Sequence, residues 1–199
     1  RWPAALSGSG WTALRVGDAA RARDIFARLS GSPVPAPLDG WSRQGLGLAL
    51  YALGRFEDAE RAGADLIARN VPPPIARDVL FWHGEALGRI GRHRDAEAQL
   101  KRFTDGGAHP LLETGLLRQG WWGLADGRAS EAVAPLRAVL AMPVRATAGN
   151  ARIRCWAPLY FRSLPRNSTM GSARASGRTV TAYPAWSSPH RTTATRARA

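Results

Sequence analysis

Small residues recur in this chain at a fixed spacing, four times over. Each instance is a glycine, a second glycine seven positions later and an alanine five positions after that. The instances are Gly10–Gly17–Ala22, Gly47–Gly54–Ala59, Gly84–Gly91–Ala96 and Gly120–Gly127–Ala132. Successive instances are 37, 37 and 36 residues apart. A near-constant step of this length is typical of a protein built from stacked repeats.

The residues around these positions predict a helical hairpin in each repeat. In the second repeat, Leu46, Leu50 and Leu53 follow the spacing of an amphipathic helix. Gly54 is expected to end this helix, because glycine tolerates the left-handed backbone of a helix C-terminus. A second amphipathic helix follows and stops before the prolines at 72–74. One hairpin cannot bury its own apolar face, but a stack of hairpins buries a continuous core.

We therefore expect an all-α fold over residues 1–143. Its hairpins are predicted at about residues 5–33, 40–72, 77–110 and 113–143. Gly47 and Ala59 are expected to let the two backbones of one hairpin approach closely. Pro135 lies inside the last predicted helix and is expected to kink it or to mark an irregularity. The first helix of the first repeat is weakened by Pro3, Gly8 and Gly10.

The pattern resembles the tetratricopeptide repeat (TPR) family over roughly residues 5–143. The matching residues are Leu46, Gly47, Tyr51, Gly54, Phe56, Ala59 and Pro72, then Gly84, Leu87, Gly91, Ala96 and Pro110, then Leu116, Gly120, Gly127, Ala132, Leu140 and Pro143. The resemblance implies a right-handed α-α superhelix, or solenoid, whose first helices line a concave groove. It also implies binding of peptides or protein surfaces, and members of this family are rarely catalytic.

The groove-facing places of the family map onto a set rich in aromatic residues. The candidates are Trp11, Leu14, Arg15, Trp41, Gln44, Leu48, Tyr51, Asp78, Phe81, Glu85, Arg89, Leu117, Trp121 and Leu124. Trp and Tyr are common at binding hot spots, so the set favours a peptide- or protein-binding groove. The alternative is that Trp41, Phe81 and Trp121 only fill gaps between repeats. Capture of a partner's C-terminal carboxylate is not expected, because Arg15 and Arg89 are accompanied by acidic residues.

Little in the sequence points to catalysis, a metal or a cofactor. The only cysteine is Cys155, which excludes an internal disulfide and a cysteine-rich zinc site. The four histidines lack metal-ligand spacing, and the glycines are explained by packing or helix termination. Glu60 and Glu97 are expected on exposed helix faces as ordinary solvated charges. We therefore expect a protein that is not an enzyme and that holds no cofactor or metal.

Residues 144–199 differ sharply in composition from the repeats. Residues 1–144 carry 18 basic and 15 acidic side chains, whereas residues 145–199 carry ten arginines and no Asp, Glu or Lys. Three interpretations remain open: a basic arm that binds nucleic acid, a disordered tail without a role, or an out-of-frame translation of a GC-rich gene. The loss of every acidic residue after Glu131 fits the third best.

The sequence thus favours a scaffold that binds a protein or peptide in a groove. The alternatives are a helical accessory region of a larger enzyme or regulator, for example one that cleaves cell walls, and nucleic-acid binding through the arginine-rich tail. No run of 18 apolar residues predicts a membrane span. The chain opens without Met and without a signal-peptide pattern, which suggests a fragment or processed form and leaves the compartment unassigned.

Overall fold

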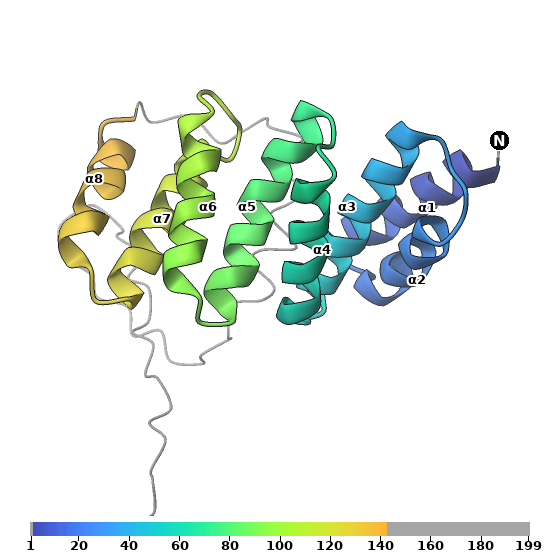
Figure 1. Cartoon of the computed structure of the whole chain (residues 1–199), viewed down its shortest axis with the longest axis horizontal. Helices are drawn as coiled ribbons and strands as arrows, with labels where there is room; N and C mark the ends of the chain where they lie inside the picture. Colours follow the sequence, from blue (N-terminus) through green and yellow to red (C-terminus); the bar gives the residue numbers. More distant parts are fainter. Residues whose placement is uncertain (1, 143–199) are drawn as a thin grey trace, which may run out of the picture. The chain divides into compact units, whose positions relative to one another are not determined.

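The computed structural model describes residues 2–142, and helices are the only regular secondary structure in this part of the chain (Figure 1). Its helices are α1 (Trp2–Val16), α2 (Ala19–Ser30), α3 (Ala36–Ala52), α4 (Phe56–Ala68), α5 (Pro73–Arg89), α6 (His93–Asp105), α7 (Leu112–Ala125) and α8 (Ala129–Leu140). The expected all-α helical repeat fold is therefore confirmed for the described residues. The tail at 144–199, with its three interpretations, lies outside them.

The helices form four antiparallel hairpins that follow one another along the array in chain order (Figure 1). Each helix packs against its neighbours in sequence, and each first helix also touches the first helix of the next hairpin. We call α1, α3, α5 and α7 the first helices, and α2, α4, α6 and α8 the second helices. None of the described helices is long and apolar enough to cross a membrane.

The turn inside each hairpin is the same structure repeated. Gly54 has a φ of +76°, and its N–H donates to the carbonyl of Tyr51 at 3.0 Å. The N–H of Arg55 donates to the carbonyl of Leu50 at 3.0 Å, which closes the left-handed helix end known as a Schellman motif. The equivalent glycines, with φ between +75° and +86°, are Gly17, Gly91 and Gly127. The second glycine of the sequence pattern is therefore a helix-terminating residue in every hairpin.

Prolines begin two of the first helices. Pro35 and Pro72 precede α3 and α5, and a further proline follows each of them within the first helical turn. Proline is accepted there because its missing N–H would have no partner inside the helix. Pro3 lies in the first turn of α1 for the same reason. Pro135 lies inside α8, which continues to Leu140, and it is buried.

Large rings fill spaces that glycines leave between the helices. Phe26 of α2 is fully buried between two glycines on neighbouring first helices. A Cβ added to Gly10 of α1 would lie 2.7 Å from the Phe26 ring, and one added to Gly45 of α3 would lie 2.5 Å from it. Neither position has room for a side chain. The first hairpin and the second are thus locked together through one aromatic ring.

The first glycine of the pattern has a different large neighbour in the second hairpin. In the other hairpins a large side chain, namely Phe26, Leu100 or Leu136, lies beside the first glycine of the pattern. The second hairpin has Gly63 at that position, and the indole of Trp82 from the next hairpin occupies the space at Gly47 instead. The imidazole of His83 lies against Gly63, where an added Cβ would be 2.7 Å from the ring. Gly47 therefore serves packing between hairpins.

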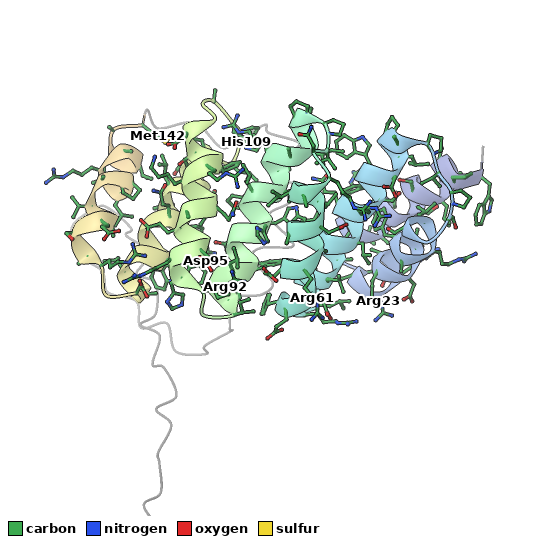
Figure 2. All side chains as sticks on the ribbon, in the orientation of Figure 1. Arg23, Arg61, Arg92, Asp95, His109 and Met142 are labelled. Carbon is green, nitrogen blue, oxygen red and sulfur yellow. The ribbon has the colours of Figure 1, made fainter. Side chains whose placement is uncertain are left out.

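A repeated ion pair joins consecutive second helices. Arg92, at the start of α6, donates to Glu60 of α4 at 3.1 Å, and its second partner is Asp95, which Figure 2 shows beside it. Arg128, the equivalent residue before α8, lies 2.6 Å from Glu97 of α6. Glu60 and Glu97 are only 18% and 14% exposed, so the prediction that they are ordinary solvated charges is wrong. They link one hairpin to the next.

The glycine positions allow a matched test of this packing. Gly8 and Gly45 lie at equivalent places in their repeats, but an added Cβ meets nothing within 4 Å at Gly8. We expect Gly45→Ala to lower the free energy of unfolding by about 1–3 kcal/mol through overpacking against Phe26. Gly8→Ala should raise it by up to about 1 kcal/mol, because alanine favours helix more than glycine. Urea unfolding measures both, and stabilisation of both variants would contradict the interlock.

Candidate functional site

The predicted groove residues separate into a buried and an exposed group. Five of the candidates are almost completely buried, at most 2% exposed: Gln44, Leu48, Tyr51, Phe81 and Glu85. The others are half-buried or exposed: Trp11, Arg15, Trp41, Arg89, Leu117, Trp121 and Leu124. Leu14 is buried and Asp78 is half-buried. Only the second group presents side chains that a partner reaches without rearrangement of the helices.

Glu85 shows why several of these positions are buried. Its Oε1 accepts a hydrogen bond from the indole N–H of Trp122 at 3.1 Å, and its Oε2 lies 3.4 Å from the Arg118 guanidinium. Both partners belong to α7, the next first helix. The Trp122 ring also occupies the space at Gly88, one turn further along α5. Glu85 and Gly88 thus face the following hairpin.

Ring contacts account for two further buried candidates. Phe81 packs against Phe103 of its own hairpin with ring centroids 5.2 Å apart. Tyr51 meets Phe56 edge-on at 5.3 Å across the Gly54 turn. The Arg89 guanidinium lies 5.7 Å from the centroid of the same Phe56 ring, so it covers the end of the second hairpin. These contacts hold the helices together.

Another buried candidate, Gln44, belongs to a short chain of polar contacts that links α3, α5 and the loop after α6. Gln44 donates its side-chain N–H to Asp78 at 3.4 Å, and His109 lies 3.1 Å from the other Asp78 oxygen. The Leu111 N–H donates to the second ring nitrogen of His109, which fixes the imidazole in place. Figure 2 shows His109 in the loop after α6, which this chain of contacts ties to α5.

Trp11 and Trp41 are brought together on α1 and α3. Their rings meet edge to face with centroids 6.3 Å apart and an interplanar angle of 78°. Trp11 also packs edge-on against the buried Phe26 at 5.3 Å, so it has a fixed base. Trp41 remains 40% exposed. Arg15 is exposed and follows Trp11 by one turn of α1, on the same helix face.

Leu117, Trp121 and Leu124 form a separate apolar stripe on α7. They are 40%, 37% and 46% exposed. Trp121 and Leu124 occupy the positions of Glu85 and Gly88 one repeat earlier, which α7 covers. They are exposed because α7 is the fourth and last of the first helices in the described residues, so no described first helix follows to cover them. The hairpin of α5 and α6 therefore lies between this stripe and the Trp11–Trp41 pair, and the predicted residues do not make one continuous site.

Sequence reasoning missed the roles of two aromatic rings and a histidine. Trp82 and Trp122 fill the spaces at Gly47 and Gly88. His93, which replaces Phe56 in the repeat, stacks on Trp122 with ring centroids 5.5 Å apart and an angle of 13°. One feature of the sequence could have indicated the roles of the two tryptophans. Each of them follows, by 34 or 35 positions or roughly one repeat, the glycine whose space it fills.

Charge on the described surface is largely compensated by neighbouring residues. Arg55 and Arg61 both pair with Asp58, and these hydrogen bonds lower the pKa of that carboxyl below its usual value. Hydrogen bonds from Arg128 and Arg94 lower the pKa of Asp126 in the same way. No group of three or more His, Cys, Asp or Glu residues in the described part is arranged to hold a metal ion.

The four stacked hairpins, their left-handed glycine turns and their interlocking first helices define a TPR-like helical repeat fold. A solved structure described as MamA MSR-1 C2, a TPR-like helical repeat protein, shares this fold with a TM-score of 0.57. The alignment is 17% identical and covers 69% of this chain and 75% of that chain. No family model matches the chain, and no curated protein matches it.

His83 is a buried titratable group beside a glycine. It is 5% exposed, and burial lowers its pKa below the ordinary histidine value. The Glu60 carboxylate, 3.7 Å from Nε2, opposes this effect, whereas the charges of Arg92 and Arg102 act in the same direction as burial. The neutral imidazole is therefore the form that the fold accommodates.

This burial predicts a pH-dependent stability. The unfolded chain has a histidine pKa of about 6.5, so below this pH the unfolded state binds the proton more readily than the folded state. We expect the free energy of unfolding to fall as the pH drops below about 6.5 until it passes the folded pKa. His83→Gln should reduce this loss between about pH 7 and about pH 5.5 in urea unfolding. Equal losses in the variant and the parent would exclude His83 as the cause.

Proposed function

We propose that this chain is a protein-interaction scaffold that binds an extended peptide segment at the Trp11–Trp41 pair. We call the surface formed by Trp11, Arg15 and Trp41 the aromatic platform. The proposal rests on one observation above all: Trp41 is 40% exposed although it packs edge to face against a tryptophan that is itself seated on the core. A large exposed ring held in a fixed orientation provides contact area at little entropic cost.

The chemistry of the platform favours a particular kind of peptide. The two indoles offer an apolar, aromatic contact surface, and Arg15 offers a cation that projects from the same face of α1. Asp39 and Arg43 near Trp41 are engaged with each other at 2.8 Å, so they add no free charge. The peptide that fits has an aromatic or large aliphatic side chain followed or preceded by an acidic residue.

The helical repeat fold supports this proposal without defining the partner. Stacked hairpins place the first helices side by side, so residues distant in the sequence contribute to one surface. Trp11 and Trp41 come from different hairpins and meet only because α1 and α3 are adjacent. A rigid repeat stack of this kind holds a binding surface in place and does not need catalytic groups.

The experiment is a selection of peptides from a random displayed library on the full chain, followed by affinity measurement on variants. Trp41→Ala is expected to weaken the selected peptides by about 2 kcal/mol, or roughly 30-fold, the loss typical of a binding hot spot. Arg15→Ala should weaken those peptides that carry an acidic residue. Fluorescence anisotropy with labelled peptides measures both effects.

Trp2→Ala supplies the matched control. Trp2 is 61% exposed and lies 5.7 Å from the Arg28 guanidinium, away from the contact between Trp11 and Trp41. Its removal should leave the affinity unchanged. The proposal fails if the library yields no specific binder, or if Trp2→Ala and Trp41→Ala weaken the peptides equally.

A further inference from the structure

The second and third hairpins meet at a junction that carries a titratable group. The indole of Trp82 lies in the space at Gly47, and the imidazole of His83 lies against Gly63. We call the contact formed by these four residues the middle junction. In the other hairpins the position of Gly63 is taken by a large apolar side chain, namely Phe26, Leu100 or Leu136. At the middle junction an imidazole therefore occupies space that a hydrocarbon side chain fills elsewhere.

The repeat register shows that the histidine is particular to this junction. The residue one repeat before His83 is Leu46, and the residue one repeat after it is Gln119. His83 is 5% exposed, and neither ring nitrogen takes part in a hydrogen bond within the described part of the chain. A buried polar group without a hydrogen bond destabilises a fold, so packing alone does not explain a histidine at this position.

The charged groups that act on His83 belong to the second helices on both sides of the junction. The Glu60 carboxylate of α4 lies 3.7 Å from Nε2, but it also accepts a hydrogen bond at 3.1 Å from Arg92, which precedes α6. Arg102, in the last turn of α6, adds a further positive charge. A proton on the imidazole would therefore be buried near two guanidinium groups and one carboxylate that already has a partner.

The two tryptophans that join hairpins show how differently the junctions are held. Trp122 enters the space at Gly88 and donates its indole N–H to Glu85 at 3.1 Å. The indole N–H of Trp82 is buried and has no hydrogen-bond partner in the described residues. Opening of the middle junction would hydrate this N–H and the imidazole, whereas separation of α5 from α7 would break the bond between Trp122 and Glu85.

We propose that the middle junction is an acid-responsive hinge, which opens when His83 is protonated and lets the second and third hairpins separate while their helices stay formed. Burial lowers the pKa of His83, so the proton binds more tightly to the open junction than to the closed one. Opening is therefore favoured as the pH falls below about 6.5, the pKa of a hydrated histidine. This movement within the folded array is separate from the loss of global stability, and it does not depend on the proposed peptide binding.

Thiol accessibility at two equivalent positions tests the hinge. Ala86 of α5 and Ala49 of α3 lie one repeat apart, and both are 0% exposed. Ala86 has the register position of Trp122, which lies against the preceding first helix, so a cysteine there reports on the middle junction. A cysteine at Ala49 reports on the junction before it. Ala86→Cys and Ala49→Cys in the full chain are treated with a dithiodipyridine, and mass spectrometry separates each new thiol from Cys155.

The ratio of the two reaction rates cancels the common effect of pH on thiol chemistry. It should rise roughly tenfold in favour of Ala86→Cys between about pH 7 and about pH 5, because linkage changes the opening equilibrium by up to about tenfold per pH unit. His83→Leu, which introduces the residue of the preceding repeat, should keep the ratio constant. His93→Phe, which introduces the residue found at position 56, should retain the full rise and serves as the control.

Three results would overturn the proposal. A constant ratio in the parent shows that acid does not open the junction, and a parallel increase at both thiols shows that acid unfolds the array as a whole. An equal rise in the His83→Leu background assigns the opening to another group. Far-UV circular dichroism at both pH values checks that the helices remain formed, and His83→Gln replaces His83→Leu if the latter does not fold.

Fluorine NMR of the chain labelled with fluorotryptophan gives a readout without an engineered thiol. Trp82→Phe and Trp11→Phe assign the two signals. On acidification the Trp82 signal should broaden, whereas the signal of Trp11, which packs on Phe26 in the first hairpin, should stay sharp. Equal changes of the two signals, or broadening of the Trp82 signal that persists in His83→Leu, would contradict the hinge.

Discussion

The structure depends on aromatic rings that enter spaces left by glycines. Phe26 lies between Gly10 and Gly45, and Trp82 and Trp122 fill the spaces at Gly47 and Gly88. Each ring is at most 4% exposed and joins elements of different hairpins. A close-packed interior has no room for both a large ring and a Cβ at the same place. The cost of glycine within a helix is therefore offset by the burial of the ring that it admits.

Regular local interactions keep these rings in register. The left-handed glycine at each hairpin turn fixes where the second helix begins, and the hydrogen bonds across the turn recur at every repeat. The pairs Arg92–Glu60 and Arg128–Glu97 then fix the offset between consecutive second helices. Because these pairs are partly exposed, their contribution to stability is modest, and their main effect is on alignment.

The same interlock determines which surfaces are free for partners. In the interior of the stack, positions such as Tyr51 and Glu85 are used to bind the neighbouring helices, so they are closed to an outside ligand. Aromatic side chains remain exposed where a neighbouring helix does not cover them. Trp41 is exposed at the α1–α3 junction, and Trp121 is exposed where no further described hairpin follows. Exposed aromatic side chains are therefore found toward the two ends of the described array.

By itself, the sequence determined the all-α repeat, the step of 36 or 37 residues and the turn at the second glycine of each unit. These features follow from local rules, namely helical periodicity and the backbone freedom of a residue such as Gly54. Only the tertiary structure decided what the first glycine and the groove candidates do. Gly47 receives Trp82 from another hairpin, Glu85 turns toward Trp122, and Trp41 stays exposed. Such roles depend on side chains about one repeat apart, and helical periodicity within a single hairpin carries no information about them.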